Sequence, residues 1–196
     1  AEQNPAADVE GKDACRKIAI LSSITFGEFI DSDKIYTEGI TAITSRDMAY
    51  AQALGRKLKL LGSYRRVNGN HAQVMVAPML LDQNHPVAVA NDVFNAIELE
   101  GNALGSAMFY GRGAGRMPTA SAVVADVIEC ALHLDKMPHM ITWQDNGRDI
   151  LIDHADCPTQ TLLRLDHLAQ LPVIEAFFAP YGIQSVKKLF DDEIAL

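Results

Sequence analysis

Apolar positions near the start of the chain recur with the period of a helix, and those in the middle alternate as in strands. The first helical pattern begins after Gly11 and ends near Phe26, where Gly27 is suited to a helix end. Residues 44–47 read Thr-Ser-Arg-Asp, which is a capping-box-like start for a second helix. The positions that continue this second helix are Met48, Ala51, Gly55 and Leu58.

Two hairpins are predicted after the second helix. The strands and their turns are 60–67 and 71–78 around Asn68-Gly69-Asn70, and 93–100 and 107–110 around Gly101-Asn102. Hairpins that lie between helices are typical of a mixed or antiparallel sheet with helices on one face. The sequence therefore predicts an α+β fold.

A glycine-rich stretch, residues 111–115, follows the second hairpin and leads into a third helical pattern, with Pro118 suited to its first position. The apolar positions of this helix are Ala120, Val123, Val124, Val127, Ile128, Ala131 and Leu132. A glycine turn at a helix N-terminus offers unpaired N–H groups to an anion or to an amide of a cofactor. Because it follows a hairpin, the turn is not the fingerprint of a dinucleotide-binding βαβ unit.

The pattern changes to shorter segments beyond Leu134. Strands are predicted at 140–144 and 150–152, and the order strand, helix, strand at 161–165, 172–181 and 182–186. The sequence therefore predicts two domains, residues 1–135 and 136–196.

Composition and charge narrow the class of protein. The chain is 48% hydrophobic and 21% charged, as in an ordinary globular protein. A net charge of −8 without any Lys/Arg run argues against a nucleic-acid partner. No apolar stretch approaches the length of a membrane span, and the polar first residues fit a cytoplasmic protein.

The three cysteines predict neither a disulfide framework nor a metal site, because they are widely spaced and form no C-x-x-C pair. Cys130 and Cys157 lie far from each other and from Cys15. Cys15 is predicted to be a small apolar filler on the core side of the first helix rather than a nucleophile.

The candidate chemistry lies on the first helix. Asp13 and Lys17 are four residues apart, so they lie one turn above each other on one face. Ile20 and Ile24 fall beside them, and the separate stripe that can face the core is Ala14, Ile18 and Leu21. A lysine in such surroundings can donate or accept a proton. The spacing alone favours the commoner alternative, an exposed surface ion pair.

Two longer motifs resemble homoserine dehydrogenases. The first runs from Glu2 to Lys17 and includes Pro5 and the run Asp-Val-Glu-Gly at residues 8–11. The second, residues 110–122, reads Tyr-Gly-Arg-Gly-Ala-Gly-Arg-Met-Pro-Thr-Ala-Ser-Ala. The similarity continues to about Val124, so it covers well over half of the chain.

The resemblance implies an enzyme that interconverts L-homoserine and L-aspartate 4-semialdehyde with NADP or NAD, in threonine and methionine biosynthesis. It implies that Lys17 is the proton donor and that Asp13 holds the substrate and orients this lysine. It further implies that Glu2 binds the α-ammonium of the substrate and that Asp8 supports the site. No metal ligand is implied among these residues.

In the same family the glycine turn closes over the nicotinamide end of the cofactor. The residues implied to bind the cofactor are Gly113, Ala114, Gly115 and Thr119. The family carries its nucleotide-binding domain, a second active-site lysine and a monovalent-cation site before the first motif, and we expect these to precede Ala1. The chain is therefore expected to be a fragment that does not turn over by itself.

Residues 136–196 resemble the first βαβ part of an ACT-type regulatory domain. The usual Pro-Gly pair before the helix is missing from residues 169–173, which leaves open whether this segment binds a feedback amino acid. The sheet-forming middle and this tail predict a homo-oligomer.

Two other classes of protein stay open. One is a binding or regulatory module without chemistry, which dimerises through its tail and is unaffected by loss of Lys17. The other is a dehydrogenase of another semialdehyde. The glyceraldehyde-phosphate type needs a cysteine nucleophile with a histidine base, and no cysteine here lies in a suitable setting.

Overall fold

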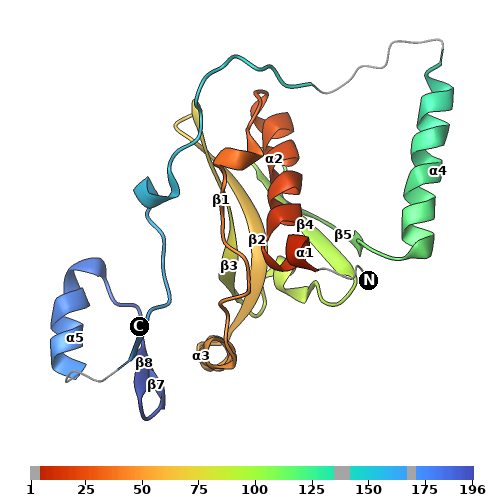
Figure 1. Ribbon diagram of the computed structural model, residues 1–196. Helices are drawn as coiled ribbons and strands as arrows, with labels where there is room; N and C mark the ends of the chain where they lie inside the picture. Colours follow the sequence, from red (N-terminus) through yellow and green to blue (C-terminus); the bar gives the residue numbers. More distant parts are fainter. Residues whose placement is uncertain (1–4, 135–141, 167–170) are drawn as a thin grey trace. The chain divides into compact units, whose positions relative to one another are not determined.

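The computed structural model describes residues 5–134, 142–166 and 171–196 (Figure 1). The chain forms two compact units, which are described separately. One consists of Ala1–Leu80 with Gln144–Leu196, and the other of Leu81–Trp143. Among the described helices, none is long and apolar enough to cross a membrane.

A three-stranded sheet with the order β1-β3-β2 is the framework of the first unit. Strands β2 (Arg56–Val67) and β3 (His71–Asp82) form the predicted hairpin, and β1 (Tyr36–Thr37) runs parallel to β3. On β3, Ala72 also forms a parallel bridge with Leu151. The sheet is therefore mixed, as predicted.

The turn of this hairpin is Asn68-Gly69-Asn70, as predicted. Asn68 and Gly69 have φ values of 50° and 75°, and these two residue types tolerate the left-handed backbone that such a turn requires. Both strands are longer than predicted, because β2 already begins at Arg56 and β3 continues to Asp82.

Helix α2 (Lys12–Phe26) packs along β2 and ends at Gly27 in the left-handed conformation, as predicted (Figure 1). The contact is close at Gly62, where an added Cβ would lie 3.0 Å from Cβ of Ile18. The buried residues of the core between helix and sheet are Cys15, Ala19, Ile30, Ile35, Ala72, Val74, Val76 and Ile150.

The buried face of α2 is rotated relative to the predicted stripe. Ile18 packs against the core, but Leu21 is 38% exposed, so its predicted place in the core is wrong. Cys15 and Ala19 lie in the centre of the contact instead. At about 100° per residue Leu21 falls on the far side of α2 from Cys15 and Ala19, with Ile18 in between against Gly62.

Helix α3 (Ser45–Ala53) begins with the predicted capping box. The Thr44 hydroxyl accepts a hydrogen bond from the Asp47 amide, and the Asp47 carboxylate accepts one from the Thr44 amide. The helix is shorter than predicted: Gly55 is left-handed (φ 65°), and Leu58 belongs to β2. A left-handed glycine directly after a helix ends it.

The second unit contains the other predicted hairpin and the third helix. Strands β4 (Phe94–Gly101) and β5 (Gly105–Arg112) pair antiparallel. Helix α4 (Arg116–Leu132) has Gly115 as its N-cap, so Pro118 is its third residue rather than its first. None of the residues of α4 is buried, so its apolar face is exposed within the described chain.

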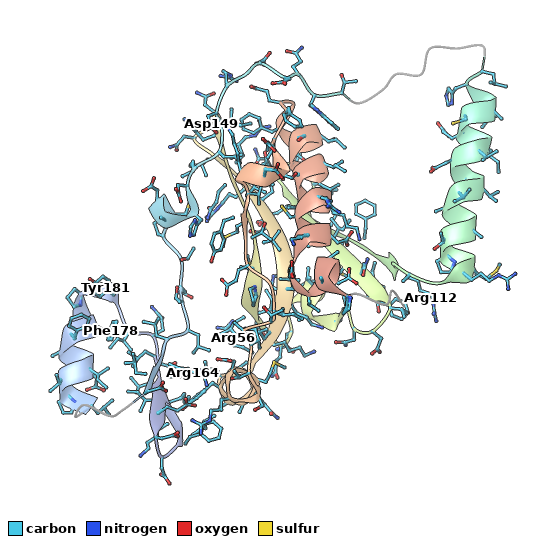
Figure 2. All side chains as sticks on the ribbon, in the orientation of Figure 1. Arg56, Arg112, Asp149, Arg164, Phe178 and Tyr181 are labelled. Atoms are coloured by element: carbon cyan, nitrogen blue, oxygen red, sulfur yellow. The ribbon has the colours of Figure 1, made fainter. Side chains whose placement is uncertain are left out.

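The segment from residue 144 to residue 156 returns along the first unit. Residues 140–144 were predicted as a strand, but Gln144 only forms a single parallel bridge with Glu28, and Met140 lies outside the described residues. The predicted strand 150–152 is likewise reduced to the bridge of Leu151. Ion pairs of Arg148 with Glu28 and of Lys34 with Asp149 fasten the segment (Figure 2).

A second three-stranded sheet, with the order β6-β8-β7, follows. Its strands are β6 (Arg164–Asp166), β7 (Lys187–Phe190) and β8 (Glu193–Ala195), and α5 (Leu171–Phe178) lies between β6 and β7 in sequence. The order strand, helix, strand is found, but residues 182–186 form no strand, which corrects that prediction. Gly182 ends a 3-10 helix in the left-handed conformation (φ 75°), and the strand that follows begins only at Lys187. The likeness to an ACT domain and the boundary between residues 135 and 136 stay predictions.

A buried charge cluster joins this sheet to α3. Glu193 is 1% exposed, and its carboxylate lies 3.3 Å from Arg164 and 3.2 Å from Arg46. Arg164 also contacts Asp47 at 2.8 Å, beside α3 (Figure 2). The Tyr50 hydroxyl donates a hydrogen bond to the Glu193 carbonyl. The second sheet is therefore attached to the helix by charge-assisted contacts.

We expect Glu193→Gln to lower the free energy of unfolding by roughly 1–3 kcal/mol, because it removes the buried carboxylate that Arg46 and Arg164 share, while Asp192 and Asp47 stay in place beside them. Urea unfolding followed by circular dichroism at neutral pH measures this. Asp191→Asn is the control, since Asp191 is fully exposed in the turn between β7 and β8, and it should change stability by less than about 0.5 kcal/mol. Equal effects of the two substitutions would contradict the prediction.

The carboxylate of Asp47 makes the stability of the protein depend on pH. Burial raises the pKa of Asp47, but hydrogen bonds from Thr44 and the charge of Arg164 lower it by more, so its net pKa lies below the usual value. The stability that Asp47 contributes is therefore present above its unfolded pKa of about 3.9 and is lost as the pH falls through the folded pKa. We expect the stability difference between wild type and Asp47→Asn to shrink as urea unfolding is repeated from pH 6 toward about pH 3. A difference that is constant with pH would refute this.

Candidate functional site

The first motif folds into a helical corner. Helix α1 (Ala6–Val9) ends at Glu10, and α2 begins after Gly11. The Gly11 amide donates to the Asp8 carbonyl at 3.1 Å, and the Gly11 carbonyl accepts from the Cys15 amide at 2.9 Å. Gly11 is buried and left-handed (φ 77°). The short turn therefore lets the chain change direction between α1 and α2.

Asp13 and Lys17 form the predicted pair on α2. Their carboxylate and ammonium are 2.7 Å apart, and the side chains are 46% and 63% exposed. Ile20 and Ile24 lie on the same side but are also exposed, at 51% and 37%. The two isoleucines therefore lie beside the ammonium, as the helical spacing indicates, but do not shield it from solvent in the described chain. The result is a solvent-accessible acid–lysine pair beside apolar side chains.

The other acidic positions of the motif differ in what the structure describes. Asp8 is exposed on α1, and the N-cap of α2 is Gly11 without any side-chain capping bond, so Asp8 does not cap that helix. Glu2 lies outside the described residues. The structure thus brings Asp13 and Lys17 together and leaves Asp8 on the preceding helix.

The glycine turn belongs to the second unit. The Gly113 amide donates to the Val93 carbonyl at 2.9 Å, and a Cβ on Gly113 would collide with the Asn95 side chain. Gly115 has φ 123° and ψ 152°, a conformation that only glycine adopts readily. Ala114 lies between the two glycines, and the Thr119 amide donates to the Gly115 carbonyl at 3.0 Å.

The first turn of α4 has no side-chain cap. Free N–H groups at such an end suit an anion or an amide oxygen. The backbone of this turn therefore fits the cofactor contact expected for it.

Cys15 lies in the core of the first unit. Cys15 is 6% exposed, and its thiol donates to the Ser32 carbonyl at 3.4 Å, which confirms the filler role. Within residues 5–134, 142–166 and 171–196, no group of three or more His, Cys, Asp or Glu side chains is placed to hold a metal ion.

Sequence patterns missed two features near the corner. One is an open hollow of about 600 Å³ beside the start of α2, lined among others by Arg16, Asp33 and Thr37. The other is the contact of Gly39 and Ile40 with the backbone of α1. Neither has a signal in sequence spacing, because residues 9–11 and 37–41 meet only in the folded chain.

Comparisons with known proteins agree with the two motifs. A family model described as homoserine dehydrogenase matches residues 1–128. A homoserine dehydrogenase of Pseudomonas aeruginosa is 41% identical over 192 residues, which are 93% of this chain and 44% of that protein. One of Bacillus subtilis is 43% identical over 65% of this chain and 29% of its own length.

Solved structures give the same result. A homoserine dehydrogenase from Thiobacillus denitrificans superposes with a TM-score of 0.87 at 34% identity, covering 100% of this chain and 48% of that one. A hyperthermophilic archaeal homoserine dehydrogenase, solved in complex with NADPH, has a TM-score of 0.54 at 26% identity over 70% of this chain and 38% of its own.

The chain therefore belongs to the homoserine dehydrogenase family. It spans less than half the length of the relatives it matches.

Proposed function

We propose that this chain is the substrate-binding and catalytic half of an enzyme that interconverts L-homoserine and L-aspartate 4-semialdehyde. The observation that supports it is the Asp13–Lys17 pair, whose two charged atoms lie 2.7 Å apart on an exposed helix face inside the family's first motif. Solvent exposure suits a group that must reach a small-molecule substrate. The pathway context is the biosynthesis of threonine and methionine, and the place of action is the cytoplasm.

In this proposal Lys17 moves the proton. Reduction of the aldehyde puts negative charge on its oxygen, and the Lys17 ammonium donates a proton there; in the reverse direction its amine accepts the hydroxyl proton of homoserine. Asp13 holds the ammonium in place through their ion pair and contacts the substrate. Glu2 binds the α-ammonium of the substrate by charge-assisted hydrogen bonds, and Asp8 supports the site.

The nicotinamide cofactor, NADP or NAD, supplies or takes the hydride. Gly113, Ala114, Gly115 and Thr119 form the turn that would hold its nicotinamide end, because no side chain caps the first N–H groups of α4, which follow Gly115. Binding of NADPH by the archaeal relative supports this class of cofactor. This chain covers 44% of the Pseudomonas aeruginosa relative and 48% of the Thiobacillus denitrificans structure. The nucleotide-binding half is therefore assigned to the remaining part of such an enzyme.

The C-terminal sheet and α5 are assigned a regulatory or assembly role. Residues 136–196 form the ACT-like part of the proposal, and the active enzyme is a homo-oligomer. The attachment of this sheet to α3 through Glu193 supports a fixed rather than a loosely tethered tail.

The alternative is an amino-acid-binding or dimerisation module without chemistry. A protein of this kind would bind an amino acid tightly, and a Lys17→Ala variant would still bind it. The ion pair with Asp13 alone does not exclude it, because exposed pairs of this kind are common in proteins.

The proposal is tested on the full-length protein that carries this sequence, by measuring homoserine oxidation with NADP and with NAD. We expect Lys17→Ala to lower kcat by on the order of a hundredfold or more, because a general acid–base group is lost. Lys12→Ala is the matched control: Lys12 lies on the same helix, is similarly exposed and has its own carboxylate partner, Glu10. Normal activity of Lys17→Ala, or equal losses in both variants, would refute the catalytic role.

A second substitution tests the cofactor turn. Gly115→Ala places a side chain at φ 123°, which costs about 1–3 kcal/mol and forces the turn to rearrange. We expect the KM for the nicotinamide cofactor to rise roughly tenfold, which is what about 1.4 kcal/mol corresponds to. Gly111→Ala is the control, since an added Cβ there meets no atom within 4 Å. An unchanged KM for the cofactor would contradict the assignment.

A further inference from the structure

The backbone of Gly39 touches the backbone of the helical corner. An added Cβ at Gly39 would lie 2.3 Å from the Val9 carbonyl oxygen, 2.6 Å from the Glu10 Cα and 2.9 Å from the Glu10 carbonyl carbon. All three atoms belong to the main chain, so no flexible side chain can move aside. The φ angle of Gly39 is outside the left-handed region, so glycine is required here for space and not for conformation.

Hydrogen bonds on both sides of Gly39 hold this contact. The Ile40 amide donates to the Val9 carbonyl at 2.8 Å, and the Glu38 amide donates to the Val76 carbonyl on β3, also at 2.8 Å. Glu38 to Ile40 therefore connects the main chain of α1 to the sheet. Val76 is fully buried, so the sheet end of this connection is rigid.

The next residue of the corner, Gly11, is packed against the same segment and the sheet. A Cβ on Gly11 would lie 3.1 Å from Cγ1 of Val76 and 3.2 Å from Cγ2 of Thr37. Gly11 therefore also lies where the packing leaves no room for a side chain. Because the atoms nearest to Gly39 are main-chain atoms, a methyl group there must displace Val9 and Glu10 away from residues 38–40, by about 1 Å if a normal van der Waals distance is to be restored.

We propose that Gly39 is a positioning residue for the catalytic acid–lysine segment: its missing side chain lets residues 38–40 clamp the Val9–Glu10 peptide and so fix α1 and the start of α2 relative to each other. This inference rests on the proposed function of Asp13 and Lys17. Asp8 precedes the clamped peptide and Asp13 follows it within three residues. A displacement of the clamp changes the distance between the carboxylate of α1 and the acid–lysine pair of α2.

The test compares Gly39→Ala with wild type in the full-length protein that carries this sequence. We expect kcat/KM for homoserine to fall by roughly tenfold to a hundredfold, because a misplacement of about 1 Å at reacting groups costs rates of that order. We also expect a larger primary isotope effect with homoserine deuterated at C4, since hydride transfer becomes slower relative to the other steps. The melting temperature and circular dichroism spectrum show how much of the protein is folded.

Gly101→Ala is the control, because an added Cβ there makes only an ordinary contact of 3.8 Å with Leu104. A merely structural role of Gly39 predicts a loss of kcat in proportion to the unfolded fraction, with unchanged KM and isotope effect. That result, or wild-type kinetics, would overturn the inference. The two proposals can fail separately. Activity in the wild type and in Lys12→Ala, together with its loss in Lys17→Ala, supports the proposed function. If Gly39→Ala then behaves like Gly101→Ala, only this inference fails. A wild-type protein that does not oxidise homoserine removes the proposed function, and the inference with it.

If Gly39→Ala does not fold, amide hydrogen exchange on the wild type tests whether residues 38–40 hold the Val9–Glu10 peptide in place. The proposal requires the Ile40 amide, which is bonded to Val9, to exchange slowly and to become slower still when homoserine and NADP are bound. An Ile40 amide that exchanges freely, or that does not respond to the substrate, overturns it.

Discussion

The close packing of α2 on β2 is the contact on which the first unit depends. At Gly62 the strand has no side chain, so the helix comes near enough for Ile18 to rest on the backbone and for Cys15 and Ala19 to fill the interface. This contact fixes the rotation of the helix about its axis. With small residues turned inward, the opposite arc carries Asp13 and Lys17 outward into solvent. Core packing and candidate chemistry are thus two faces of one helix.

The same helix is held at its start by backbone contacts rather than by side-chain burial. Gly11 rests on Val76, and residues 38–40 bridge α1 to the central strand. From Ile40 the chain continues to the capping box of α3, whose Arg46 and Asp47 meet the buried carboxylate and guanidinium of the second sheet. The acid–lysine segment and the C-terminal sheet are therefore attached to the same short stretch of chain.

Local patterns predicted local structure well. The limits of α2, the capping box at Thr44, and the Asn68-Gly69 turn depend on neighbours in sequence, and all were confirmed. The failures depend on distant partners. Residues 182–186 look like a strand by composition, yet the pairing with β8 begins at Lys187. Leu21 fits an apolar stripe by spacing, but the buried side of α2 is centred on Cys15 and Ala19, whose partners lie far away in the sequence.

The candidate site shows the same division. The i,i+4 spacing correctly predicted that Asp13 and Lys17 share one helix face. Their spacing and exposure alone, however, are those of an ordinary surface ion pair. What distinguishes this pair is its position inside a motif shared with a family of dehydrogenases, and the main-chain clamp at its base. A solvated pair on a helix that is free to slide would gain nothing from a glycine at position 39, where an added Cβ would lie only 2.3 Å from the Val9 carbonyl oxygen. A main-chain contact of this kind holds the start of α2 in one place, and the proposed role of Lys17 as proton donor to a developing charge requires such a fixed position.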